Sequence, residues 1–438
     1  MIPVFISLLI KKGFAQDLET TVSEAKKTLK EDPFSVNGSL GLNSVFYKAK
    51  GILPRRDPFY WVLNAQLQFT LFNKVSVPFT AVVTQQDKNF THGLERFSQP
   101  FNQFGLSPKY RWLTVHAGFR SLVFSEYSLS GALFLGGGVE IKPKNSLWSG
   151  TAFYGRFVKA VPSGGVDGIV VSLPAYARWG GGSKLRVGND AHWGEFSFLK
   201  IRDDARSIPY DTVYDMAPQE NEVLTAASRH RVTPWLSAGA EISLSMFTKN
   251  LYSESMRFEG FNYVNQIYPV KTSTQFNKAV VGELDFHAGK YKLGLKYKRI
   301  DPDYRSLGAI FLTNDVEEIS VNSHLGLAKG KVTLSTAAGV QQNNLDRVQA
   351  LTARRLIVSL DVSYNITPQL NVSSAYSNFS SNSLPVRDVF NDTIRFVQLT
   401  QNGSFNTSYT FGKKNIKHHL IQSATYQESA GSDQATSQ

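Results

Sequence analysis

The chain has 438 residues, of which 42% are hydrophobic and 12% aromatic, and its formal net charge is +12 at a mean hydropathy of −0.21. It contains no cysteine, which excludes disulfides, cysteine metal sites, thiol catalysis and a lipoprotein anchor, and no apolar run approaches the roughly 18 residues of a membrane helix. The positive charge suits a basic interior wall or contact with anionic lipid groups better than nucleic acid, because the basic residues are dispersed and no basic helix is expected.

The first residues are typical of an exported protein. Residues 2–10 are apolar, and Gly13 and Ala15 supply the small side chains of a signal-peptidase site. We therefore predict a signal peptide over residues 1–15, although Lys11 and Lys12 follow the apolar run where a typical signal has its charges before it.

Residues 16–33 form a short predicted periplasmic leader. Leu18, Val22, Ala25 and Leu29 recur at helical spacing, which favours a short amphipathic helix. A frayed leader without structure explains the same residues, and both alternatives stay open.

Residues 61–83 carry the pattern that the rest of the chain repeats. Apolar side chains occupy every second position from Trp61 to Leu71, and the alternation resumes at Val75 after a loop of three residues. Such a loop places both apolar rows on one face of a hairpin. Each strand has about ten alternating residues, enough for a tilted strand to cross a bilayer. The polar positions between the apolar ones are predicted to face a lumen: Asn64, Gln66 and Gln68.

The alternation continues from residue 34 to residue 427, and the connections that interrupt it are short and long in turn. Short turns are expected near residues 73, 111, 143, 189, 233, 289, 329, 368 and 413. Long polar connections are expected at residues 48–58, 86–100, 159–172, 203–220, 250–271, 301–314, 343–352 and 378–392. Outer-membrane barrels have tight periplasmic turns and longer outer loops. The sequence therefore predicts an all-β fold, a large antiparallel transmembrane β-barrel of about 18–20 strands.

Two later hairpins extend the assignment of faces. A two-residue turn at residues 289–290 pairs Phe286 with Leu293 on the lipid side and His287 with Lys292 on the other side. A turn at residues 329–330 pairs Leu327 with Val332 on the lipid side, and it places His324 opposite Ser335 on the other side. The parity of the strands gives the remaining lumen-facing candidates: His116, Arg229, Arg231, Glu283, Asp285, His287, Lys292, Lys296, Lys298, His324 and Asp361.

The charged lumen candidates admit two interpretations. They can form a lattice of ion pairs that satisfies a polar wall, or a charged path for a solute, and the two are not exclusive. Four of the six tryptophans lie close to predicted short turns, where an interfacial aromatic girdle is expected. These interfacial candidates are Trp112, Trp148, Trp193 and Trp235.

Several stretches of the sequence are familiar. They are residues 104–112 (FGLSPKYRW), 136–140 (GGGVE), 299–304 (RIDPDY) and 314–317 (NDVE). Through them, residues 34–411 resemble outer-membrane β-barrel proteins of Bacteroidota, most of them uncharacterised. The resemblance implies the compartment and the fold, and it carries over no catalytic or binding residue.

Three groups of residues have the composition of a phosphate-binding loop, a calcium site or a hydrolase active site. The glycine triplets at residues 136–138 and 180–182 lack the Lys-Ser/Thr and the helix of a phosphate loop, and strand glycines mark bulges or close approaches. The acidic residues 203–222 do not have the spacing of a calcium loop, which favours a solvated acidic loop. His116, His287 and His324 lack the serine elbow and the metal-binding helix of hydrolases. We therefore expect no enzymatic activity, no catalytic residue, no metal and no cofactor.

These observations predict a protein of the bacterial outer membrane that passes small polar or anionic solutes. The competing hypothesis is a barrel that anchors or scaffolds a surface, secretion or assembly complex. Expected partners are outer-membrane lipid and lipopolysaccharide, small solutes and surface-complex proteins, and nucleic acid is not among them.

The last segments raise the question of closure. Residues 34–47 and 416–426 are both expected to run outward, and residues 428–438 form a polar tail without an alternating run. Single-chain bacterial barrels have an even number of strands. We therefore expect that the barrel within this sequence lacks at least one closing strand.

Overall fold

The structure is a computed structural model that describes residues 33–52, 58–85, 102–162, 164–166, 169–172, 174–209, 216–256, 268–385, 396–413 and 416–433. The predicted signal peptide, the predicted leader helix and the connection at residues 86–100 lie outside these ranges. Among the described residues, no helix has the length and apolar character needed to cross a membrane.

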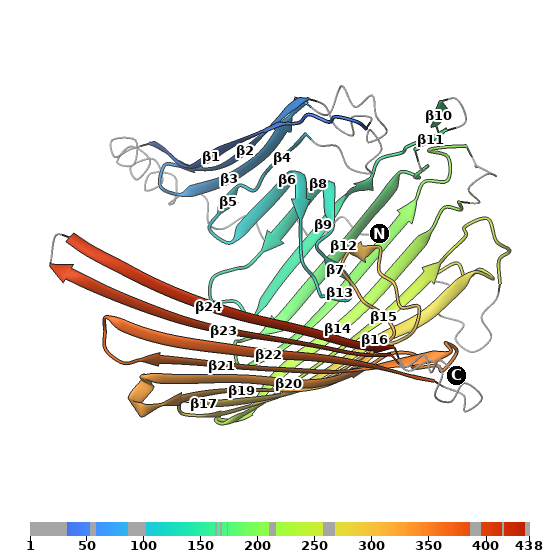
Figure 1. Cartoon of the computed structure of the whole chain (residues 1–438). Helices are drawn as coiled ribbons and strands as arrows, with labels where there is room; N and C mark the ends of the chain where they lie inside the picture. Colours follow the sequence, from blue (N-terminus) through green and yellow to red (C-terminus); the bar gives the residue numbers. More distant parts are fainter. Residues whose placement is uncertain are drawn as a thin grey trace. The chain divides into compact units, whose positions relative to one another are not determined.

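The fold is all-β, as predicted (Figure 1). Twenty strands belong to one antiparallel sheet. β4 and β5 share the neighbours β3 and β6, so they occupy one position, and the sheet has nineteen positions. The twenty strands are β1 (Phe34–Phe46), β2 (Phe59–Leu71), β3 (Val75–Thr84), β4 (Gln103–Leu106), β5 (Lys109–Tyr110), β6 (Leu113–Ser121), β8 (Leu133–Ile141), β9 (Trp148–Val158), β12 (Arg178–Gly188), β13 (His192–Asp203), β14 (Glu220–Thr233), β15 (Leu236–Thr248), β16 (Thr274–Ala288), β17 (Tyr291–Ile300), β19 (Val316–Leu327), β20 (Val332–Gln342), β21 (Leu351–Asn365), β22 (Leu370–Pro385), β23 (Phe396–Lys413) and β24 (Ile416–Asp433).

Four short strands form two further pairs. β10 (Gly164–Val166) pairs with β11 (Ile169–Ser172) within a connection that the sequence marks as long. β7 (Leu129–Ser130) pairs in parallel with β18 (Gly308–Ala309). A 3-10 turn, η2 (Ala328–Gly330), joins β19 to β20.

The chain divides into two compact units. The first contains residues 1–122, 132–183 and 201–218, and the second contains residues 123–131, 184–200 and 219–438. In the first unit, β1, β2, β3, the β4 and β5 pair, β6, β8 and β9 follow one another in antiparallel register. In the second unit, β14 to β17 and β19 to β24 do the same.

The predicted registers of the three hairpins are confirmed. Leu71 pairs with Val75 across residues 72–74. His287 pairs with Lys292, and Leu327 pairs with Val332. The short turns impose these registers, because a turn of fixed length fixes the partner of every residue in both strands.

The sheet of the second unit has two chemically different faces. One, the apolar face, carries a row of directly opposed side chains on five neighbouring strands: Leu284, Leu295, Val321, Ala338 and Val358. The other, the polar face, carries the next row: Asp285, Gly294, Asn322, Ala337 and Ser359. Side chains alternate between the faces with period two, so each strand contributes to both.

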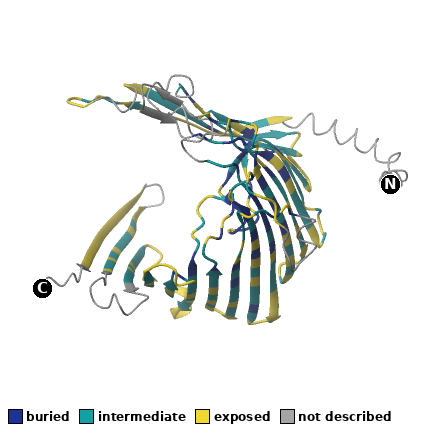
Figure 2. Cartoon of the chain, turned by 90° about the vertical axis from the view of Figure 1, so that its right-hand side faces the viewer, coloured by how far each residue is buried: buried dark blue, intermediate teal, exposed yellow. Residues whose placement is uncertain are grey.

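Two segments of the second unit, residues 123–131 and 301–315, pack on the polar face and are called the covering segments. Tyr127 of the first and Tyr304 of the second are buried against Ala279, Val281 and Ile300. These three residues have the parity of the polar face. The buried hydrophobic cluster therefore lies on the same side of the sheet as the polar face. It occupies the end of that side where the strands meet the long connections. Figure 2 shows the buried positions in dark blue on a set of neighbouring strands, whereas β24 beside the C-terminal label is exposed.

Three boundaries differ from the prediction. The segment at 123–131 was not predicted as a connection, because Phe124 and Leu129 are apolar and extend the pattern of β6. β22 continues to Pro385, and β24 continues to Asp433 instead of ending at residue 427. The extension of β24 has no large apolar side chain and that of β22 has only Phe379 and Leu384 without regular alternation, so hydrogen-bonded backbone continues where hydrophobic alternation has stopped.

The acidic residues predicted as a solvated loop are partly buried, and this prediction is wrong for three of them. Asp203 forms a two-pronged ion pair with Arg178, at 2.7 and 3.0 Å. Glu220 and Glu222 are buried beside the ammonium group of Lys200. Burial of carboxylates is tolerable here because each has a cationic partner.

Candidate functional site

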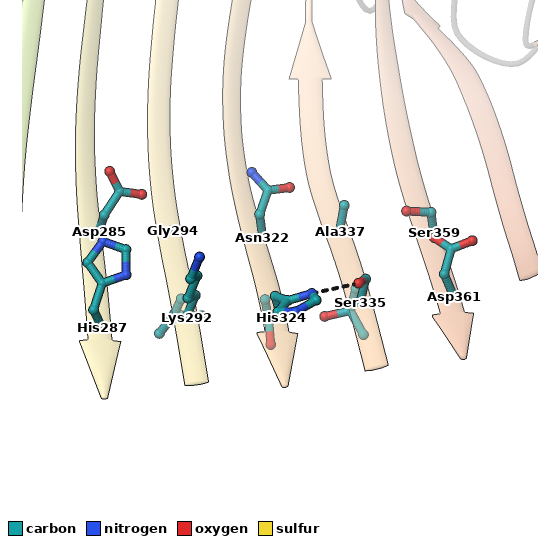
Figure 3. A pocket seen from close by; sticks show the side chains of 13 residues that line it. Asp285, His287, Lys292, Gly294, Asn322, His324, Ser335, Ala337, Ser359 and Asp361 are labelled. Carbon is teal, nitrogen blue, oxygen red and sulfur yellow. Dashed lines mark hydrogen bonds between the residues drawn. The ribbon is translucent and has the colours of Figure 1, made fainter. Parts of the chain in front are cut away.

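A row of ionisable side chains crosses the polar face near the short turns of the second unit. His287 on β16 lies opposite Lys292 on β17, and Lys292 lies opposite His324 on β19. Residues directly opposed on antiparallel strands have Cβ atoms about 4.5–5.5 Å apart. Figure 3 shows the three side chains next to one another on three strands. We call His287, Lys292 and His324 the basic row.

The same row continues onto two further strands with different chemistry. Ser335 on β20 lies opposite His324, and Asp361 on β21 lies opposite Ser335. The Oγ atom of Ser335 is 3.0 Å from Nδ1 of His324 (Figure 3). The row therefore has a basic end and an end that offers a hydroxyl and a carboxylate.

These five side chains line an open pocket of about 390 Å³. Its remaining lining comes mainly from the adjacent row of the polar face and is small or polar: Asp285, Gly294, Asn322, Ala337 and Ser359. Small side chains at Gly294 and Ala337 leave the space that the longer neighbours enclose. The arrangement can donate hydrogen bonds at one end and accept them at the other.

Most of the other predicted charged residues form ion pairs on the polar face. The guanidinium of Arg229 contacts the carboxylate of Asp285 and lies 3.6 Å from that of Glu283. Glu283 is also 3.1 Å from Nζ of Lys296, and Lys298 is 3.1 Å from Glu318. The lattice interpretation is thus supported for these residues.

The basic row is outside this lattice. Lys292 and Arg231 have no ion pair with any residue that the structure describes, and neither does Asp361. Since Asp285 is engaged by Arg229, the charge of Lys292 is left without a direct counter-charge in the described part of the pocket. An uncompensated cation beside hydrogen-bond donors is suited to an anionic group.

Hydrogen bonds hold the covering segments at the far end of the polar face. The hydroxyl of Tyr304 donates to the carbonyl of Tyr127 at 2.8 Å. The fully buried Asn221 accepts from the backbone N–H of Leu307 at 3.1 Å and donates to Oγ of Ser245 at 2.9 Å. Burial raises the pKa of the Tyr304 phenol above its usual range, so the hydroxyl keeps the proton that it donates.

The predicted residues of the first unit lie on one face of its sheet, at a distance in sequence from the pocket. Asn64, Gln66 and Gln68 alternate with the apolar row of β2, and Gln68 donates to Oγ of Ser76 at 2.6 Å. His116 is 9% exposed and is not free. Its Nδ1 lies 2.8 Å from Oγ of Ser107, and its Nε2 lies 3.0 Å from a carboxylate oxygen of Glu140. These contacts give His116 a structural position between β4, β6 and β8.

The four tryptophans lie at the ends of strands, next to the predicted turns. Trp112 precedes β6, Trp148 begins β9, Trp193 is the second residue of β13, and Trp235 lies between β14 and β15. Trp235 stacks on Phe286 of the apolar face, with ring centroids 6.1 Å apart. The guanidinium of Arg186 lies 4.1 Å from the ring of Trp193. Their interfacial role stays a prediction.

The sequence did not single out Asn322, Ser335 and Ser359 as site residues. They carry no charge, and isolated serines and asparagines are common in strands. The signal that identifies them is the register, since His324 was already predicted to face Ser335. Following that register by one more strand reaches Asp361, and the adjacent row reaches Ser359.

No protein-family model and no curated protein matches the chain. Solved structures that it resembles include Pseudomonas aeruginosa OpdQ, with a TM-score of 0.42 and 10% identity over 90% of this chain and 97% of that one. P. aeruginosa OccK2 (OpdF) in complex with glucuronate gives 0.42 and 10% over 90% and 96%. P. aeruginosa OpdK with vanillate gives 0.41 and 9% over 90% and 98%.

Proposed function

We propose that this chain is an outer-membrane β-barrel channel or transporter that passes small polar or anionic solutes. In this proposal the apolar face of the sheet contacts lipid and the polar face lines the path. The compartment is the bacterial outer membrane, with its lipid and lipopolysaccharide as surroundings. The resemblance to Bacteroidota barrels belongs to the same proposal, as does the export signal at residues 1–15.

The observation that carries the proposal is the separation of the two faces. Leu284, Leu295 and Val321 are 41%, 38% and 37% exposed, although they are apolar and directly opposed. A large exposed apolar surface on a strand face needs a nonaqueous neighbour. The opposite face carries ion pairs and the basic row, which require water or polar partners. A boundary between lipid and a polar interior satisfies both requirements.

The covering segments support a second candidate, a barrel that serves as an anchor or scaffold. They fill part of the polar face with buried tyrosines held by hydrogen bonds, and a filled interior is what a scaffold needs. In this alternative the proteins of a surface or secretion complex are the partners. The pocket at the other end of the same face favours the channel over the scaffold, because no covering segment is among its lining residues and its charged side chains border open space.

The proposal is tested by the reversal potential of the purified protein in a planar bilayer separating two concentrations of potassium chloride. We expect a discrete conductance and a preference for chloride. Lys292 and Arg231 carry positive charges on the polar face without an ion-pair partner among the described residues, and a confined wall amplifies an uncompensated charge. A preference for potassium would contradict the anionic part of the proposal, and an absence of conductance would favour the scaffold.

A further inference from the structure

We propose that the pocket on the polar face binds a solute with one carboxylate and several hydroxyl groups, held at the carboxylate by the basic row. This inference rests on the proposed function for its biological meaning. The binding step itself depends only on the pocket. The separation of the two faces indicates only that polar solutes pass. The inference adds the chemical class of the solute and the place on the polar face where it binds.

The basic row provides the carboxylate end. His287, Lys292 and His324 come from three consecutive strands and stand on one row, so their nitrogen donors line the same end of the pocket. Lys292 adds a charge that no described residue of the pocket neutralises. A charge-assisted hydrogen bond is roughly twice as strong as a neutral one. The row therefore selects an oxyanion over an uncharged group.

The contact with Ser335 orients His324 for this role. A serine hydroxyl can donate to Nδ1, at the observed 3.0 Å, and the proton of the neutral imidazole then resides on Nε2. That nitrogen is the one left to donate to a ligand. Replacement of Ser335 by alanine removes this orientation while leaving the charge of the pocket unchanged.

The other end of the pocket matches hydroxyl groups. Ser335 and Ser359 can donate and accept, and Asp361 accepts without a cationic partner among the described residues. The backbones of β17 and β21 are three strand spacings apart, about 14 Å. Side chains shorten this span from both sides, so an extended solute of about six carbons can reach from Lys292 to Asp361.

The acidic groups also argue against a small dianion. Asp285 and Asp361 both line the pocket, and a second negative charge on the ligand would meet them. The charge of Asp285 is already compensated by Arg229, which leaves Asp361 for hydroxyl donors. One negative charge near Lys292 and hydroxyls near Asp361 therefore fit better than inorganic phosphate.

The test is calorimetric titration of the purified full chain in detergent with gluconate, and with sorbitol as the uncharged polyol of similar length. We expect gluconate to bind and sorbitol to bind at least about tenfold more weakly. Lys292→Gln should weaken gluconate binding by about tenfold or more. Lys331→Gln, which removes the same charge from the exposed turn after η2, should change it by less than about twofold.

A second set of variants separates the two ends of the pocket. Asp361→Asn should weaken gluconate more than acetate, which has the carboxylate without hydroxyls, whereas Ser335→Ala, which also removes the orientation of His324, should weaken both. If Lys292→Gln does not fold, as judged by its electrophoretic mobility before and after heating, His324→Gln takes its place with the same expectation.

The inference is overturned if gluconate does not bind, if sorbitol binds equally well, if inorganic phosphate displaces gluconate and binds as tightly, or if Lys292→Gln and Lys331→Gln behave alike. A conducting protein without gluconate binding would refute this inference and leave the proposed function standing. A protein that binds gluconate but does not conduct would support this inference and refute the proposed function.

Discussion

Replacement of Val321 by arginine is expected to destabilise the protein by about 2–4 kcal/mol, if Val321 lies near the bilayer midplane. Val321 stands on the apolar face between Leu295 and Ala338 and is 37% exposed. In the proposed orientation the new guanidinium would lie in hydrocarbon, where its hydration is lost. The free energy is measured by urea-induced unfolding of the protein in lipid vesicles.

The matched control is Asn322→Arg, one residue further along the same strand. Asn322 belongs to the polar face, opposite Gly294 and Ala337, so its replacement has room and meets water. We expect a cost below about 1 kcal/mol for this variant. Equal costs for the two arginines would show that the faces are wrongly assigned or that the apolar face does not contact lipid.

Replacement of Tyr304 by alanine is expected to release the covering segment at residues 301–315, with a loss of about 3–5 kcal/mol in the free energy that holds it. Tyr304 is 1% exposed and packs with Tyr127 on Ala279, Val281 and Ile300. The alanine variant loses that packing and the hydrogen bond to the carbonyl of Tyr127. Hydrogen exchange of the backbone amide of Leu307, which donates to Asn221, reports the release.

Tyr304→Phe separates packing from hydrogen bonding. It keeps the ring and removes only the hydroxyl, so the expected loss is about 1 kcal/mol. Unchanged protection of the Leu307 amide in the alanine variant would mean that the segment is held by Asn221 and its other contacts alone.

The faces of the strands could be predicted from the sequence because the side chains of a strand alternate with period two. Once a short turn fixes one pair, every other pair in that hairpin follows. For this reason the alternation and the turn lengths alone correctly predict that His287 pairs with Lys292 and His324 with Ser335. The ion pair of Glu283 with Lys296 follows from the same register.

Contacts between segments distant in the sequence could not be predicted in this way. Phe124 and Leu129 have the composition of a strand, yet the segment that contains them turns onto the polar face and meets Gly308 and Tyr304. The cationic partner of Glu222, Lys200, lies on the preceding strand, 22 residues away across a long connection. No local pattern marks such a partner, because it depends on which strands the long connections bring together.

The pairing of the first and last strands, which would close a barrel, also lies beyond what local patterns can predict. The prediction that a closing strand is missing rested on the directions of the first and last strands. It stays a prediction, because it concerns how the two units meet. The extension of β24 to Asp433 changes its basis, since residues 427–433 pair with β23 and are no longer a polar tail.

The central claim, a sheet with one face in lipid and the other on a water-filled path, is tested most directly by single cysteines placed along β17. The chain has no cysteine of its own, so each introduced thiol is the only one present. In lipid vesicles, thiols at positions 292, 294, 296 and 298 should react with a water-soluble maleimide. Thiols at 293, 295 and 297 should instead be protected from it and react with a lipid-soluble reagent. Equal reaction of all seven positions with the water-soluble reagent would contradict the claim.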